Sequence, residues 1–203
     1  MSPHATIRII QDEHRALSAV LRSIDLLLSE CRRLGAVPDF ATLRAMLFYI
    51  DEFPEKVHHT KESHLLFPIL RARSTELAAI LDRLDHDHAG SERAVRELEH
   101  QLLGLEMMGD AVDATSRRVR FEDAMHAYIA SYMEHIRTEE QLILPLAERV
   151  LTPADWATLD AAFMENRDPL THREPDDAYR PLFMRILMTL PAPLGLGPAM
   201  NAA

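Results

Sequence analysis

Histidine is over-represented in this chain of 203 residues, which has eleven of them against one tryptophan and four tyrosines. Two of these histidines stand four residues before a glutamate, in the pairs His58/Glu62 and His135/Glu139. Because a helix turns by about 400° over four residues, each pair would present both side chains on one face, one turn apart. Imidazole and carboxylate groups in this arrangement suit two metal ions bridged by two carboxylates.

Two further histidines fall on apolar helical stripes. His14 interrupts a stripe of isoleucines and leucines near the start of the chain, and His88 interrupts a leucine stripe in the middle. Its neighbour His86 lies about 200° away around the same helix and is expected to face solvent. The histidine and carboxylate groups therefore come from four separate segments of the chain.

Four long segments carry these residues, and clusters of helix-breaking residues separate them. The clusters cover residues 35–39, 73–75, 109–113 and 152–153, and apolar residues recur every three or four positions between them. This pattern predicts an all-α protein, an up-down-up-down four-helix bundle over residues 1–152. Pro54 is expected to kink the second helix one turn before His58.

The remaining residues, 153–203, are predicted to form a short helical extension and a flexible tail. Asp155 to Met164 reads as a short helix that begins after Thr152 and Pro153, and Asp176 to Leu190 reads as another. Residues 191–203 are rich in proline, glycine and alanine and need not be ordered. The extension would cover one face of the bundle or mediate association, for example into a homodimer.

The residue numbers alone indicate whether the histidines and glutamates lie at the same level of the bundle. In a bundle with short loops, two residues on consecutive antiparallel helices share a level when they are equidistant from the turn between them. The midpoint of His14 and His58 is residue 36, and that of the His58/Glu62 pair with His88 is residue 74. The midpoint of His88 with the His135/Glu139 pair falls between residues 112 and 113. All three midpoints lie in breaker clusters, so the four helices are expected to bring their polar groups to one layer.

Such a layer calls for an explanation, because unpaired carboxylates and imidazoles are costly to bury. One buried histidine with a hydrogen bond is common, and one His/Glu pair four residues apart is often only a surface contact. Groups from four helices at one level are much harder to produce by accident. The pattern therefore predicts a metal site in the core of the bundle.

Charge and cysteine content exclude several other classes of function. The formal net charge of -10 would repel the phosphates of nucleic acid and an anionic membrane surface. No stretch approaches the roughly 20 apolar residues that span a bilayer. The lone cysteine, Cys31, cannot form an internal disulfide, and the first residues do not resemble a secretory signal. We therefore expect a soluble cytoplasmic protein without a nucleic-acid or membrane partner.

The same residues resemble the hemerythrin HHE cation-binding family, in which a histidine, an HxxxE pair, a second histidine and a second HxxxE pair follow one another along four helices. The resemblance covers about residues 4 to 150. It rests on Asp12-Glu13-His14-Arg15, His58-His59-Thr60-Lys61-Glu62 running into Leu66-Phe67-Pro68, Leu84 to His88, and His135-Ile136-Arg137-Thr138-Glu139 running into Leu144-Pro145.

This resemblance implies two iron ions joined by an oxo or hydroxo bridge, although other divalent metals also suit imidazole and carboxylate ligands. Members of the family commonly use five histidines and two bridging carboxylates, which leaves one coordination position for a diatomic ligand such as oxygen or nitric oxide. Four of the histidines and both glutamates are evident: His14, His58, His88, His135, Glu62 and Glu139.

The fifth histidine is less evident, and two residues compete for its place. His59 fits because Glu62 lies angularly between it and His58, so that all three share about 100° of one face. Glu92 stands where animal hemerythrins have a histidine four residues after that of the third helix. It would act either as a ligand or as a hydrogen-bond acceptor for one.

Three readings of function follow. The first is a protein that binds a diatomic ligand, or senses or stores iron, without turnover. The second is a di-iron enzyme acting on peroxide or nitric oxide, in which Tyr128, Tyr132 or Glu140 joins the metals. The third, a ferritin-like oxidase, would use Glu-x-x-His pairs such as Glu55/His58 and Glu97/His100. It fits less well, because His14 and His88 occupy stripe positions where that class has glutamates.

Overall fold

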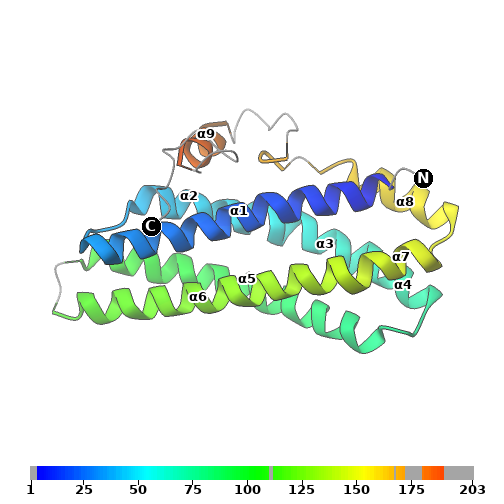
Figure 1. Cartoon of the computed structure of the whole chain (residues 1–203), viewed down its shortest axis with the longest axis horizontal. Helices are drawn as coiled ribbons and strands as arrows, with labels where there is room; N and C mark the ends of the chain where they lie inside the picture. Colours follow the sequence, from blue (N-terminus) through cyan, green and yellow to red (C-terminus); the bar gives the residue numbers. More distant parts are fainter. Residues whose placement is uncertain (1–3, 110–111, 167, 172–179, 190–203) are drawn as a thin grey trace.

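The computed structural model describes residues 4–109, 112–166, 168–171 and 180–189 of the chain. Four long helical stretches lie side by side, and consecutive stretches run in opposite directions along the long axis (Figure 1). The first is helix α1, Ala5–Leu34. No strand occurs among the described residues, and the prediction of an all-α bundle is confirmed.

Wide helical turns interrupt the second stretch. It consists of α2 (Phe40–Ile50), the π-helical segment η1 (Asp51–His58), α3 (His59–Lys61), the π-helical segment η2 (Glu62–Leu66) and α4 (Phe67–Arg73). Pro54 lies inside η1. A proline lacks the N–H group of a regular helix and crowds the carbonyl four residues before it. The helix accommodates Pro54 by widening to the π-helical pattern just before His58.

The third and fourth stretches complete the bundle. Helix α5 (Ala78–Met107) packs along α6 (Ala114–Thr138). The fourth stretch continues through a third π-helical segment, η3 (Glu139–Ile143), into α7 (Leu144–Val150).

Helix boundaries follow the predicted breaker clusters. Helix α1 ends at Gly35, whose left-handed backbone (φ 62°) suits glycine, and whose N–H donates to the carbonyl of Arg32. The Asp39 carboxylate caps α2 by accepting from the backbone N–H groups of Ala41 and Thr42. Short connections of this kind hold consecutive helices antiparallel, which fixes the level at which their side chains meet.

Two apolar clusters fill the bundle, one on either side of a polar layer. The first lies towards the end with the 35–39 turn and includes Leu21, Leu43, Leu102 and Phe121. The second lies towards the other end and includes Ile10, Leu70, Leu81 and Ile143, together with residues of α8. The polar layer between them consists of buried histidines and glutamates from all four stretches: His14, His58, His59, Glu62, His88, His135 and Glu139.

The extension beyond residue 152 packs on the bundle. Helix α8 (Pro153–Phe163) contacts α1, and α9 (Arg180–Thr189) contacts α2 (Figure 1). The Thr152 and Asp155 side chains form a capping box at the start of α8. The predicted start of the last helix at Asp176 and the predicted tail, 191–203, lie outside the described residues. The division of the chain at residue 152 stays a prediction.

None of the helices in the described ranges combines the length and the apolar character needed to cross a lipid bilayer.

Candidate metal centre

The polar layer gathers seven of the eight predicted metal-binding residues, and all seven are buried. They form two groups that share Glu62, and within each group the potential ligand atoms lie within 4.8 Å of one another. The three-histidine side contains His59, Glu62, His88 and His135, and the two-histidine side contains His14, His58, Glu62 and Glu139. This geometry provides two neighbouring positions for a metal ion.

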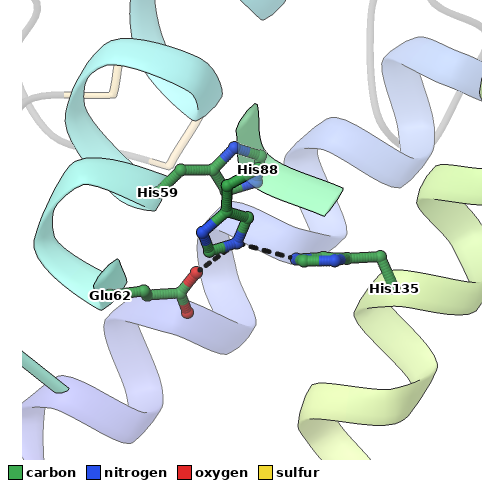
Figure 2. A group of neighbouring side chains, drawn as sticks. All are labelled: His59, Glu62, His88 and His135. Atoms are coloured by element: carbon green, nitrogen blue, oxygen red, sulfur yellow. Dashed lines mark hydrogen bonds and ion pairs between the residues drawn. The ribbon is translucent and has the colours of Figure 1, made fainter. Parts of the chain in front are cut away.

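Figure 2 shows the three-histidine side, with His88 lying between Glu62 and His135. The His88 Nε2 is 3.0 Å from Nε2 of His135 and 3.6 Å from Oε2 of Glu62. The ring of His59 stacks on that of His88 at a centroid distance of 3.9 Å. The three imidazoles come from α3, α5 and α6, so this side forms only when the bundle is closed.

Both glutamates touch histidines of the two sides. Oε1 of Glu139 is 3.3 Å from Nε2 of His135, and its Oε2 is 3.2 Å from Nε2 of His14. Oε2 of Glu62 is 3.3 Å from Nε2 of His58 as well as near His88. A carboxylate with a neighbour on each side is suited to bridging two ions.

Several of these atoms are buried without a hydrogen bond. They are Nε2 of His58, Oε2 of Glu62, and both carboxylate oxygens of Glu139. Leaving buried polar atoms unsatisfied costs about 1–3 kcal/mol each, and more when the group is charged. All four atoms belong to the polar layer, and a metal ion between them would satisfy them together. The residues therefore fit a metal.

The distances between the potential ligand atoms also fit a metal ion. Ligands bound at about 2.1 Å from an ion and at right angles to one another lie about 3 Å apart. The His88–His135 nitrogen pair and the His14–Glu139 and His58–Glu62 contacts are 3.0, 3.2 and 3.3 Å apart. Only small movements would be needed to surround an ion.

The far nitrogens of the rings are held by other side chains, as is usual for histidines that bind metals. Nδ1 of His58 donates to Oε2 of Glu13 at 2.7 Å, and Nδ1 of His59 donates to Oε2 of Glu55 at 3.0 Å. The remaining partners are Glu140 for His14, at 3.1 Å, and Ser63 for His88, at 2.8 Å. The Nε2 atoms of His14, His58 and His88 face the layer, whereas Nε2 of His59 accepts from the Tyr132 hydroxyl.

Burial and mutual charge set the protonation of the layer. Burial opposes the charged form of His135, but the Glu139 carboxylate outweighs it and raises the pKa of His135 to about 9. Burial also opposes charging of His14 and His58, yet the glutamates beside them raise the pKa of both. By contrast, burial and neighbouring histidines lower the pKa of His59 and of His88.

The pKa values of the two bridging candidates, Glu62 and Glu139, shift in opposite directions. Burial and repulsion from Glu139 raise the pKa of Glu62, whereas for Glu139 the attraction of His135 and His14 overcomes burial and lowers the pKa. Without metal, the layer therefore balances its charge with protons on some histidines, which an incoming ion would have to displace.

The surroundings of the two sides differ. A cavity of about 290 Å³ lies between α5 and α6 beside the three-histidine side, where Tyr128 and Tyr132 contribute phenols to its wall. The Tyr132 hydroxyl donates to Nε2 of His59 at 2.7 Å, and that of Tyr128 donates to Oε1 of Glu55 at 3.0 Å. Both tyrosines are thus close to the layer as well as part of the core.

The two-histidine side borders a void of only about 10 Å³, lined by Glu13, His14, Leu17, Pro54, His58 and Asp168. A separate surface groove of about 490 Å³ runs between α1 and α6 and reaches His14 and Glu140.

Glu92 requires a correction, because it does not reach the layer. Its side chain is 49% exposed and forms an ion pair with Arg96 on the surface of α5. Four residues of helix turn by about 400°, so Glu92 is rotated away from His88 and lies beyond the face of α5 that packs inwards. There its carboxylate pairs with Arg96 in contact with solvent. His59, by contrast, is 4% exposed and lies in the layer beside Glu62, His88 and His135.

Other sequence-based expectations can be compared directly. His86 is exposed, as expected, and lies at the wall of the larger cavity. Glu97 and His100, the pair that a ferritin-like site would need, are both exposed on α5. Glu55 is buried, but it accepts from His59 rather than pointing into the layer beside His58.

The two Glu residues of the HxxxE pairs each begin a π-helical segment, which the helical-stripe analysis did not predict. The carbonyl of Glu62 accepts from the N–H of Phe67, and that of Glu139 accepts from Leu144, five residues on in both cases. A proline follows immediately, Pro68 in one copy and Pro145 in the other. A proline six residues after each glutamate was therefore a usable signal, because it removes a regular helical hydrogen bond.

Sequence reasoning also missed several residues that hold the histidines. Glu13 and Ser63 adjoin predicted ligands in the sequence, and Glu55 precedes His59 by one helical turn, so proximity was a weak signal. Asn166 had no such signal. It lies far along the chain and donates to both carboxylate oxygens of Glu13, at 2.9 and 3.1 Å.

Comparison with known proteins agrees with this geometry. A search of curated proteins found no match to the chain. The family model of the hemerythrin HHE cation binding domain matches residues 5–147, which include the whole polar layer and the four long helical stretches except the last turn of α7. The chain therefore belongs to the hemerythrin HHE cation-binding family.

Proposed function

We propose that this protein binds two iron ions in the polar layer and uses them to handle a small diatomic ligand such as oxygen or nitric oxide. His59, His88 and His135 would hold one ion, His14 and His58 the other, and Glu62 and Glu139 would bridge them. The ions would supply the electrons that such a ligand takes up. An iron-sensing or iron-storing role would use the same residues.

The observation that carries the proposal is the set of buried atoms without hydrogen bonds. Nε2 of His58, Oε2 of Glu62 and both oxygens of Glu139 face one another between two apolar clusters. A layer built only for stability would satisfy these atoms with hydrogen bonds, since buried polar groups nearly always have partners. Metal ions satisfy them all at once.

The two sides of the layer have different numbers of histidines, which supports a coordination position for a small ligand on the side with fewer. With both glutamates as bridges, three imidazoles and two carboxylates would surround one ion, whereas two imidazoles and two carboxylates would surround the other, which would be one ligand short. The void beside His14 and His58, about 10 Å³, is close to the size of a single water. Leu17 and Pro54 give it an apolar wall, which suits an uncharged diatomic molecule.

Iron content and the visible spectrum test this proposal together. Protein reduced without air should contain two irons per chain, and an absorption band should appear in air and disappear when oxygen is removed. Protein loaded with zinc is the control, because zinc has no redox chemistry. Fewer than one iron per chain would contradict the proposal.

An enzyme acting on peroxide or nitric oxide is the second candidate, and the cavity between α5 and α6 beside the three-histidine side favours it. Its volume of about 290 Å³ exceeds the need of a diatomic ligand, and the Tyr132 hydroxyl lies 2.7 Å from His59. Turnover would appear as irreversible oxidation with loss of added peroxide. The variant Tyr132→Phe should slow that loss at least tenfold while keeping both irons, and Tyr128→Phe is the matched control.

We also propose a cytoplasmic location. Cys31, the sole cysteine of the chain, is buried as a free thiol in α1, which is compatible with a reducing compartment.

A further inference from the structure

The segment that follows the family domain is fastened to the bundle at several points. We call residues 152–166 together with 168–171 the closing segment. The N–H and hydroxyl of Thr6 both donate to Oδ1 of Asp160, at 2.8 and 2.7 Å. The Lys61 ammonium donates to the carbonyl of Ala162 at 2.6 Å. These contacts tie α8 to the first and second stretches on the flank of His58.

Asn166 lies at the inner end of this segment and is 1% exposed. Its Nδ2 donates to both oxygens of Glu13, and its Oδ1 accepts from the Lys61 ammonium at 2.6 Å. The partners fix the orientation of the amide, because a carboxylate only accepts and an ammonium only donates. Asn166 therefore holds the Glu13 carboxylate in one position.

Glu13 in turn controls His58. Its Oε2 accepts from Nδ1 of His58 at 2.7 Å, so Nδ1 keeps its proton, and Nε2, which faces Glu62, is the nitrogen that becomes free to bind an ion when the ring gives up its other proton. The Nδ1–H tautomer that then remains is the one that a metal ligand needs. His14, His59 and His88 have partners from the bundle itself, Glu140, Glu55 and Ser63. Among these, Glu13 is the partner that the closing segment holds.

Asp168, two positions after Asn166, lies on the same flank. Its carboxylate is 4% exposed, accepts from the Tyr49 hydroxyl at 2.7 Å, and lines the small void beside His14 and His58. Both Asn166 and Asp168 thus reach the two-histidine side, and both lie outside the residues that match the family model, 5–147.

We propose that the closing segment completes the two-histidine side of the metal centre, with Asn166 as a positioning residue that acts on His58 through Glu13. The inference rests on the metal-binding part of the proposed function and is independent of the identity of the metal or of the small ligand. It assigns to the extension a specific role in metal affinity, beyond covering the bundle.

Stepwise metal affinity tests the proposal in the full-length protein. Metal-free protein is titrated with Zn²⁺ against a chromophoric chelator, which yields a separate dissociation constant for each ion. Asn166→Leu keeps the branched shape of the side chain but removes both hydrogen-bonding functions. It should weaken binding of one ion about 10–100-fold, the range expected when a partner of a ligating histidine is lost, and leave the other within about threefold. Asn166→Ala leaves room for a bridging water and should have a smaller effect.

Asp160→Ala is the matched control, because it breaks another anchor of the same segment without touching Glu13 or His58. It should lower the melting temperature but leave both dissociation constants within about threefold. If the Asn166 variants bind both ions as the wild type does, or if Asp160→Ala weakens the same ion equally, the proposal is overturned. A wild-type protein that binds no metal would refute the proposed function first, so the two failures are distinguishable.

Metal-free protein gives a second readout if Asn166→Leu does not fold. In Asn166→Ala, the NMR signal of the His58 Nδ1–H proton, which the contact with Glu13 protects, should exchange faster with water, whereas that of the His59 Nδ1–H proton should not change. Unchanged His58 signals would contradict the positioning role.

Discussion

The two sides of the polar layer are built from the same sequence motif but have different surroundings. Each HxxxE pair is followed by a π-helical segment and a proline, and each glutamate contacts histidines of both sides. The three-histidine side borders a cavity of about 290 Å³ with two phenols in its wall. The flank of His58 borders a void of about 10 Å³ and is covered by Asn166 and Asp168.

The difference in surroundings shows that the HxxxE motif determines the ligands of the centre but not the space around them. The repeated pairs provide ligands that can hold two ions, while the neighbours of each side decide what else can approach. A phenol beside His59 suits electron or proton transfer, whereas a closed flank beside His58 suits a single small ligand.

Removing a ligand from one side should have the largest effect. His88→Ala deletes a central imidazole of the three-histidine side and should reduce the metal content from two ions to at most one per chain. His86→Ala, two residues away and exposed, should keep both ions. Elemental analysis after desalting measures this, and two ions retained in His88→Ala would show that the side has been assigned wrongly.

Removing both ions should destabilise the protein markedly. Ligand binding at about a thousand times the dissociation constant contributes roughly 4 kcal/mol, and for a domain of this size each kcal/mol shifts the melting temperature by about 2–4 °C. Chelation should therefore lower the melting temperature by about 8–16 °C, and restoring the metal should reverse the change. Equal melting temperatures with and without metal would argue against ions that bridge four helices.

The stability of the metal-free protein should depend on pH, because three of its buried histidines are protonated when no metal is bound. The folded pKa of His135, about 9, exceeds that of an unfolded histidine, about 6.5, and those of His14 and His58 are also raised. The stabilisation from these protonated histidines is complete below about pH 6.5 and is lost as the pH rises towards 9. Metal-free protein should thus become easier to unfold with urea between pH 7 and 9.

The affinity for metal should increase between pH 7 and 9, because fewer protons remain on the histidines for the ion to displace. Calorimetry of Zn²⁺ binding in buffers of different ionisation enthalpy should detect proton release at pH 7 that declines by pH 9. No proton release at pH 7 would mean that the histidines are already neutral in the metal-free protein.

Glu92→Ala should have the smallest effect. The side chain is half exposed and pairs only with Arg96 on the surface, so its loss should change stability by no more than about 0.5 kcal/mol. Both metal dissociation constants should stay unchanged within error. A tenfold loss of affinity for either ion would reinstate Glu92 as part of the centre.

Much of this arrangement could be predicted from the sequence, because periodicity and turn positions are local signals. The midpoints of the polar groups fell in the breaker clusters, and the helix boundaries follow those clusters. The contrast between His86 and His88 followed from helical geometry alone. The choice between His59 and Glu92 could not be made in this way. It depends on the π-helical turn around Pro54 and on the exact rotation of α5, neither of which an ideal helix describes.

The rest of the centre depends on contacts between distant parts of the chain. Asn166 and Glu13 are separated by 153 positions, and no periodicity or motif links them. Asp168 reaches Tyr49 in the same way. Such contacts arise from how an irregular segment packs on the completed bundle, so only the folded structure reveals them.

Anomalous diffraction from crystals of the iron-loaded protein would locate the metal ions. We expect two iron peaks in the polar layer, one bonded to His59, His88 and His135 and the other to His14 and His58, with Glu62 and Glu139 between them. A single peak, or iron bound away from this layer, would contradict the proposed arrangement.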